Sequence, residues 1–288
     1  MTKLWDTHMH TAFSGDCDIP PEVMLNRAKE LGLPGIVFTD HLDWDYPGKI
    51  PGEFDLEIED YLLYMGKLLE IEATTSPTTE LRIGLELGLQ PHLATRHKDL
   101  LEKLPIDYCI GSVHTVHQRD PYYPTYFEGR DVKDAYKEYF ECVLENLDAF
   151  SAFDSLGHLD YVVRYGKRVL GDNKGACNLA DYKEIVEAIF KFIIKNDIAL
   201  EVNTGAYRAG LTEPNPSFEF LKFYRQCGGN LITIGADAHH PEHVGLHYEK
   251  IAEELTSLGF KEYAIYKQHK AEMMTLGTVL LSSSSEYN

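Results

Sequence analysis

The order of hydrophobic and polar residues predicts strands and helices that alternate along most of the chain. Short runs rich in Ile, Val and Leu are typical of buried strands, and longer segments between them have the apolar spacing of amphipathic helices. The expected strands comprise residues 4–10, 35–39, 81–86, 107–113, 153–156, 198–202 and 231–235, with a last short one at 263–266. Helices are expected over residues 20–31, 56–71, 92–104, 132–147, 182–195, 218–227 and 243–258.

This alternation predicts a parallel sheet covered by helices on both faces. Seven such units in a chain of 288 residues favour a closed barrel over a doubly wound sheet. The dinucleotide-binding alternative lacks its usual GxGxxG after the first strand. Since no internal repeat or linker is visible, we expect one barrel domain over residues 1–280 and a C-terminal tail over 281–288, which contains a run of four serines.

Composition and charge narrow the class of protein. Hydrophobic (44%) and charged (25%) contents are those of an ordinary soluble protein, and no membrane span or secretory signal is expected. The five cysteines are scattered without a CxxC pair, which favours a reduced, cytoplasmic protein over a disulfide scaffold. No membrane partner is expected, and a net charge of −19 argues against a nucleic acid partner. A small anionic ligand stays possible because bound cations change the local sign.

Histidines and carboxylates gather at the carboxyl ends of the expected strands. His8 and His10, two apart in an extended run, point the same way, and Asp16 in the next loop can reach the same end. Strand ends are surface loops where such residues are common, but their recurrence on successive strands favours a site at the barrel mouth. The set comprises His8, His10, Asp16, His41, Glu86, His114, His158, Asp237 and His239.

Mixed imidazole and carboxylate ligands suit Zn²⁺, Mn²⁺ or Fe²⁺. Nine ligands are too many for one ion and about right for three divalent ions, provided that one carboxylate bridges. Such a site suits phosphoester hydrolysis, because metal ions activate water and hold the attacking and leaving oxygens.

The strand-end motifs resemble those of the PHP (polymerase and histidinol phosphatase) family over nearly the whole chain. They are H-x-H, T-D-H, G-x-E, S-V-H, G-H-x-D and D-A-H, in this order. The length, together with residues 157–161 and 201–204, resembles the stand-alone histidinol-phosphate phosphatases of histidine biosynthesis. The resemblance implies a distorted (β/α)7 TIM-like barrel with a trinuclear metal site.

The resemblance also distributes the ligands among three ions. The first ion takes His8, His10, Glu86 and Asp237; the second takes Glu86, which bridges, with His114 and His158; the third takes Asp16, His41 and His239. Family members often have histidine where Asp16 stands, so this chain has a harder ligand at the third site.

A phosphomonoester substrate needs cations other than the metals in the mouth. Arg164 follows the fifth strand and Arg208 the sixth, and both look like the family's phosphate-binding arginines. Further substrate contacts are expected from Ser14, His117, Tyr122 and His243, whereas His92 and His97 are expected on the surface of an outer helix.

The resulting hypothesis is hydrolysis of L-histidinol phosphate to L-histidinol and phosphate by a histidinol-phosphatase. Asp237, His239, Arg164 and Arg208 would be catalytic. Asp237 would orient the attacking water, and the two arginines would hold the nonbridging phosphate oxygens. One alternative is a PHP phosphoesterase for another phosphomonoester or a nucleotide. The other is a non-catalytic, metal-stabilised PHP module, which the complete ligand set disfavours.

Overall fold

The core of the molecule is a curled sheet of parallel strands. The computed structural model describes residues 3–48, 52–75, 78–171 and 173–277. Six strands pair side by side in chain order, and every pair is parallel. They are β1 (Gly35–Leu42), β2 (Glu80–Gly88), β3 (Tyr108–Ser112), β4 (Ser155–Leu156), β5 (Ala199–Asn203) and β6 (Ile232–Gly235).

The N-terminal segment, residues 4–10, lies between the first and last of these strands. Asp6 forms a parallel bridge with Ile36 of β1, and Met9 forms one with Ala238, just after β6. The backbone N–H of Thr7 donates to the carbonyl of Ile234 at 3.0 Å, on the β6 side. The segment therefore closes the curled sheet, and the predicted distorted barrel of parallel strands is confirmed.

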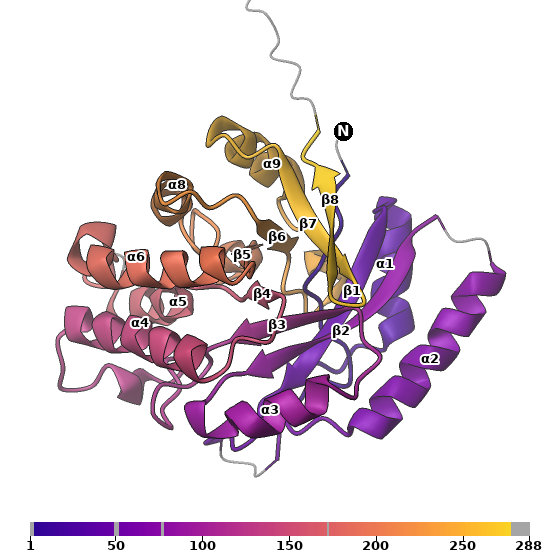
Figure 1. Cartoon of the computed structure of the whole chain (residues 1–288), viewed down its shortest axis with the longest axis horizontal. Coiled ribbons are helices and arrows are strands. Elements are labelled where there is room, and N and C mark those ends of the chain that lie inside the picture. Colours follow the sequence, from indigo (N-terminus) through magenta and orange to yellow (C-terminus); the bar gives the residue numbers. More distant parts are fainter. Residues whose placement is uncertain (1–2, 49–51, 76–77, 172, 278–288) are drawn as a thin grey trace, which may run out of the picture.

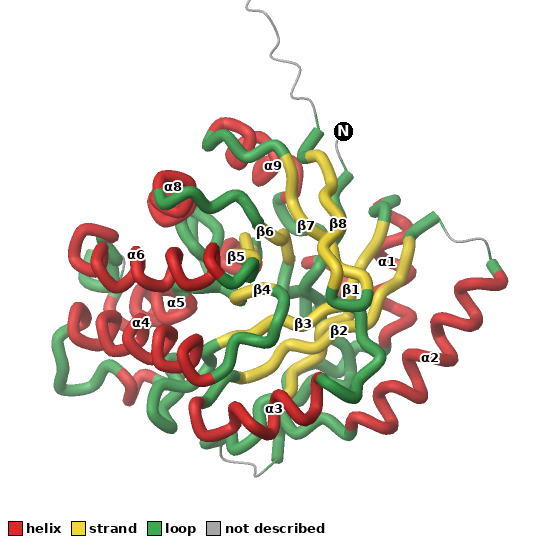
Figure 2. Tube along the Cα trace, in the orientation of Figure 1, coloured by secondary structure: helices red, strands yellow, loops and turns green. Residues whose placement is uncertain are grey.

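Helices surround the strands on the outside (Figures 1 and 2). Among the described residues the α-helices are α1 (Pro21–Leu31), α2 (Ile58–Thr74), α3 (Ala94–Leu101), α4 (Val132–Ala149), α5 (Tyr161–Leu170), α6 (Leu179–Lys195), α7 (Gly205–Arg208), α8 (Phe218–Gln226) and α9 (Tyr248–Ser257). Short 3₁₀ turns cover η1 (Pro91–Leu93), η2 (Pro124–Tyr126) and η3 (Pro241–His243). None of the described helices is long and apolar enough to cross a membrane.

Local sequence explains where α1 begins and ends. Pro21 occupies the first helical turn, where its missing N–H costs no hydrogen bond. Gly32 ends the helix with a left-handed φ of 64°, a conformation that glycine adopts without steric cost. The buried face carries Met24 and Ala28, so this predicted helix is confirmed.

Three helical regions differ from the prediction. Helices α5 and α7 were not expected, and α9 begins at Tyr248 because residues 241–243 form η3 instead. The buried positions of α5 include Arg164 and Gly166, so the apolar spacing that predicts a helix is interrupted. His97 of α3, expected on the surface, is fully buried and stacks on Trp44 with ring centroids 5.3 Å apart.

An antiparallel hairpin covers the amino-terminal ends of the strands. It comprises β7 (Glu262–Lys267) and β8 (Lys270–Thr275), of which only the first was expected. The Tyr263 hydroxyl accepts from the backbone N–H of Trp5, and the Tyr266 carbonyl accepts from Arg82 near the start of β2. The hairpin thus closes one end of the barrel and leaves the other end for chemistry. The predicted boundary at 280/281 and the tail lie outside the described residues.

Candidate metal centre

Glu86 lies at the centre of a cluster of histidines at the carboxyl ends of the strands. It is fully buried in β2, opposite His41 of β1. Its Oε2 lies 3.2 Å from Nε2 of His8 and 2.9 Å from Nδ1 of His41. Its Oε1 lies 3.2 Å from Nε2 of His114 and 3.0 Å from Nε2 of His158. One carboxylate therefore faces histidines from four different segments.

His8 and His10 face the same interior point, as their spacing predicts. Their Nε2 atoms are 3.0 Å apart. Nε2 of His10 also lies 3.5 Å from both Oε2 of Glu86 and Oδ1 of Asp237. Asp237 has a left-handed backbone with φ of 54°, a conformation that is uncommon for non-glycine residues.

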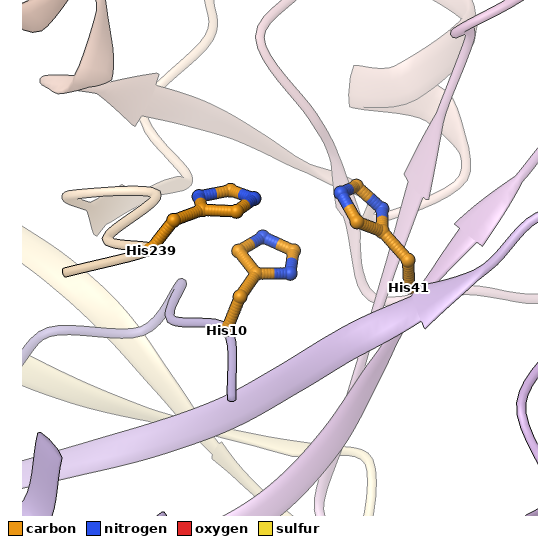
Figure 3. Close-up of side chains that lie close together, drawn as sticks. All are labelled: His10, His41 and His239. Carbon is orange, nitrogen blue, oxygen red and sulfur yellow. The ribbon is translucent and has the colours of Figure 1, made fainter. Parts of the chain in front are cut away.

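His10, His41 and His239 form a second group, in which the three rings gather from separate segments (Figure 3). The ring centroids of His10 and His239 are 4.0 Å apart, and those of His10 and His41 are 4.2 Å apart. Oδ2 of Asp16 approaches Nε2 of His239 at 3.1 Å and Nε2 of His41 at 3.8 Å. The structure thus brings all nine predicted ligands to one end of the barrel.

The donor atoms suit bound cations. Zn–N bonds of about 2.0–2.1 Å place neighbouring ligand atoms roughly 3–3.5 Å apart, the range found around Glu86. Several buried polar atoms of the cluster make no hydrogen bond: Nδ1 of His41, Oε2 of Glu86, Nδ1 of His158 and Nε2 of His239. Buried polar atoms are normally satisfied, so these indicate room for cations.

The charges of the cluster depend strongly on one another. Burial opposes protonation of His8, but the carboxylates of Glu201 and Glu86 raise its pKa well above the usual value. Burial, together with His239 and His41, holds the pKa of His10 well below its usual value. Although burial alone would raise the pKa of Asp237, the neighbouring His8, His10 and Arg164 keep it well below the ordinary range. The carboxylate is therefore ionised and available as a ligand.

Glu201 of β5 supports the histidines from behind. Its Oε1 lies 2.5 Å from Nδ1 of His8, and its Oε2 accepts from the backbone N–H of His158 at 2.8 Å. A carboxylate on Nδ1 fixes the ring so that Nε2 faces the site, the usual arrangement behind metal-binding histidines. None of the nine predicted ligands comes from strand 198–202, and this supporting role of Glu201 was not predicted.

Asp43, just beyond β1, supports two other rings. Its Oδ1 lies 2.9 Å from Nδ1 of His114, and its Oδ2 lies 3.4 Å from Nδ1 of His41. The side chain fits because residue 88 is glycine: a Cβ there would collide with the Asp43 carboxylate. Asp43 was also not predicted.

Arg164 is fully engaged by the protein. Nη1 donates to Oδ2 of Asp237 at 2.9 Å, Nη2 donates to Asn203 at 2.7 Å, and Nε donates to Asn215 at 2.5 Å. The guanidinium is 4% exposed at the floor of the cavity, where burial opposes its charge and Asp237 raises its pKa. Its clearest action is to orient Asp237.

Arg208, at the end of α7, is the more accessible cation. Its side chain is 28% exposed, and Nη1 donates to the backbone carbonyl of Asp237 at 2.8 Å. Nη2 lies 3.8 Å from Oδ1 of Asp237, a longer contact that leaves this end free to meet a ligand. Both arginines line the same cavity as six of the nine predicted metal ligands.

The cavity has a volume of about 450 Å³, and its outer wall is aromatic and acidic. Tyr122, a predicted contact, lines it. Several lining residues were not predicted because they lie in loops and in α5, outside the strand-end pattern: Asp43, Tyr46, Glu53, Phe54, Asp120, Tyr161 and Tyr165.

Three predicted substrate contacts do not line the cavity. Ser14 is buried beneath the cavity. Its hydroxyl accepts from the backbone N–H of His41 at 3.0 Å and lies 3.0 Å from Nδ1 of His10, so it positions these two predicted ligands. His117 faces outward and pairs with Glu145, because the chain turns there with a left-handed φ of 48°. His243 is in η3 and pairs with Glu242.

Comparison with known proteins places this geometry in a family. A family model described as PHP domain matches residues 6–205. A histidinol-phosphatase of Lactococcus lactis is 30% identical over 94% of this chain and 97% of its own length. A probable histidinol-phosphatase of Clostridium acetobutylicum is 29% identical over 85% of this chain and 90% of its own.

A solved structure agrees with the fold throughout. The crystal structure of histidinol phosphate phosphatase from Lactococcus lactis, complexed with zinc, L-histidinol and phosphate, has a TM-score of 0.83 and 28% identity, covering 94% of this chain and 100% of the other. The barrel, the strand-end ligands and the family match agree, and the chain belongs to the PHP domain family, alongside proteins named histidinol-phosphatase.

Proposed function

We propose that the protein is a metal-dependent phosphatase that hydrolyses L-histidinol phosphate to L-histidinol and phosphate, a reaction of histidine biosynthesis. The observation that carries this proposal is the convergence of nine imidazole and carboxylate side chains at one end of the barrel, six of which line a cavity together with two arginines. The relative from Lactococcus lactis, which matches over 94% of this chain, has L-histidinol and phosphate bound in its structure.

The nine ligands would hold three divalent ions of the zinc, manganese or iron type. We assign His8, His10, Glu86 and Asp237 to the first ion and His114 and His158, with Glu86 shared, to the second. The third ion would take Asp16, His41 and His239. The two oxygens of Glu86 face opposite groups of histidines, which supports a bridging role.

When bound, such ions activate water for attack on phosphorus and neutralise charge on the phosphate oxygens. The protein's own contribution is positioning. Asp237, oriented by Arg164, lies where it can accept a hydrogen bond from the attacking water, and His239 lies beside it. Arg208 offers a partly exposed guanidinium for the nonbridging oxygens.

The cavity wall suits the other end of the substrate. Histidinol carries an amine and an imidazole, both of which are cationic when protonated. Asp120 and Glu53 place carboxylates on the wall, and Tyr161 and Tyr165 place aromatic faces beside them. Such a wall favours a cationic, planar group through charge and cation–π attraction. A nucleotide would bring further negative charge against these carboxylates, which disfavours the nucleotide alternative.

The proposal is tested by removing the metals and restoring them. Chelated protein should release no phosphate from L-histidinol phosphate, and Mn²⁺ or Zn²⁺ should restore the activity. The Glu86→Gln variant, which loses the shared carboxylate charge, should stay inactive with either ion. Metal-loaded parent protein that releases no phosphate from any ester would favour a non-catalytic module.

A further inference from the structure

A second group of metal-binding side chains lies outside the barrel mouth. His117 follows β3, while Cys142 and Glu145 lie three residues apart on α4. One donor atom from each residue lies within 4.8 Å of the other two. Nε2 of His117 is 3.0 Å from Oε2 of Glu145. None of the three lines the catalytic cavity.

Cys142 supplies the sulfur ligand of this group. The residue is 1% exposed, and its thiol contacts the Thr115 carbonyl at a long 3.8 Å. The Asn146 amide donates to its sulfur at 3.5 Å, which would stabilise a thiolate as outer-shell donors do at metal–cysteine sites. With no cation present, burial raises the pKa of the Cys142 thiol to about 12.

The neighbouring charges leave Glu145 available. Glu138 also approaches His117, at 3.4 Å, but it is paired with Arg119 at 2.5 Å and Arg130 at 2.6 Å. The only ion-pair partner of Glu145 among the described residues is His117. A cation would therefore replace a histidine proton as the partner of Glu145 and leave the Glu138 network intact.

We propose that Cys142, His117 and Glu145 bind one Zn²⁺ or a similar thiol-seeking divalent ion, separate from the catalytic centre. Thiolate sulfur, imidazole nitrogen and carboxylate oxygen are the ligand types that zinc takes, and a water completes four-coordination at this exposed edge. On binding, the ion replaces the thiol proton, which passes to solvent. Mg²⁺ and Ca²⁺ prefer oxygen ligands and do not suit the site.

An ion at this site would affect the loop that follows β3. His117 is three residues after His114 in the loop that also supplies Asp120 to the cavity wall. An ion held between His117 and α4 would fasten this loop to the helix that packs outside it.

A sulfur-specific signal tests the proposal on the manganese-loaded enzyme. The nine proposed catalytic ligands include no cysteine, so near-ultraviolet thiolate-to-metal absorption on adding Cd²⁺ reports a site of this kind. We expect about one equivalent of Cd²⁺ to produce the band. Cys142→Ser should abolish it, whereas Cys17→Ser, which alters the thiol next to Asp16, should retain it.

Two surface variants keep the test independent of the buried sulfur. His117→Ala and Glu145→Gln alter exposed side chains, so the fold should persist, and each should weaken Cd²⁺ binding about tenfold or more. The proposal is overturned if no band appears, if the band survives Cys142→Ser, or if it disappears in Cys17→Ser. Unchanged affinity in both surface variants would also overturn it.

Discussion

Oε1 of Glu201 lies 2.5 Å from Nδ1 of His8, and neither residue is exposed to solvent. The contact orients His8 Nε2 toward Glu86 and Asp237, so Glu201 acts on the candidate metal site by holding the buried ring of His8 in place. This contact explains why the charged residue Glu201 lies in the middle of the apolar strand β5.

Replacing Glu201 should therefore weaken metal binding. Glu201→Gln keeps the size of the side chain but removes its charge, and we expect about a 10–100-fold loss of affinity for the tightest ion. Metal content after dialysis against graded chelator measures this directly. Glu213→Gln, a carboxylate outside the cluster, serves as the control. Equal metal retention in the Glu201 variant and the parent would contradict the assigned role.

The two arginines should differ in their kinetic effects. Arg164 makes three side-chain contacts and orients Asp237, so Arg164→Lys should lower kcat by about 10²-fold or more, because an ammonium cannot make all three. Arg208→Lys keeps a cation at the more exposed position and should mainly raise KM. Steady-state kinetics on L-histidinol phosphate separates the two, and identical kinetic changes in both variants would refute the distinction.

Asp16 should set the metal preference of the third group. A carboxylate oxygen there favours harder ions than an imidazole does. We expect Asp16→His to shift the ratio of activity with Zn²⁺ to activity with Mn²⁺ about tenfold toward zinc. Asp18→His, which changes a carboxylate two residues away, is the matched control. A ratio unchanged by Asp16→His would argue against a metal-ligating role for Asp16.

Buried His97 should make stability depend on pH. Burial lowers the pKa of its imidazole to about 4, below its ordinary value of 6.5. Between pH 6.5 and pH 4 the unfolded chain binds the proton while the folded protein does not, so stability falls as the pH falls. The contribution is absent above pH 6.5 and amounts to about 2 kcal/mol at pH 5.

His97→Phe keeps an aromatic ring against Trp44 and removes this titration. Urea unfolding of both proteins at pH 7, 6 and 5 gives the free energy of unfolding for each. We expect the parent to lose about 2 kcal/mol more than the variant between pH 7 and pH 5. A difference between the two proteins that is constant over this range would show that folding does not shift the pKa of His97.

The strand-end ligands could be predicted because parallel strands direct their carboxyl ends to one mouth, and His41, Glu86 and Asp237 stand at those ends. Glu201 was missed because it lies inside a strand. The available signal was a charge between Leu200 and Val202, both fully buried. Arg164 was expected near the site, but its partners Asn203 and Asn215 come from segments whose approach depends on tertiary packing.

His117 shows that spacing along the sequence does not always predict which way a side chain points. It comes three positions after His114, yet the ring of His117, which follows a left-handed backbone, faces Glu145, whereas the ring of His114 faces Glu86. His97 shows another limit, because a histidine packed between Trp44 and Phe150 has the same sequence pattern as one on a helix surface. Both outcomes depend on contacts distant in the sequence.

Substrate preference tests most directly whether the protein acts as a histidinol-phosphatase. Phosphate release by the metal-loaded protein should be compared on L-histidinol phosphate, a nucleoside monophosphate, a simple aryl phosphate and a short oligonucleotide. We expect the highest kcat/KM on L-histidinol phosphate, by about 10²-fold or more. Only this substrate places a cationic imidazole and amine against Asp120 and Glu53. Equal or higher kcat/KM on the nucleotide would contradict it.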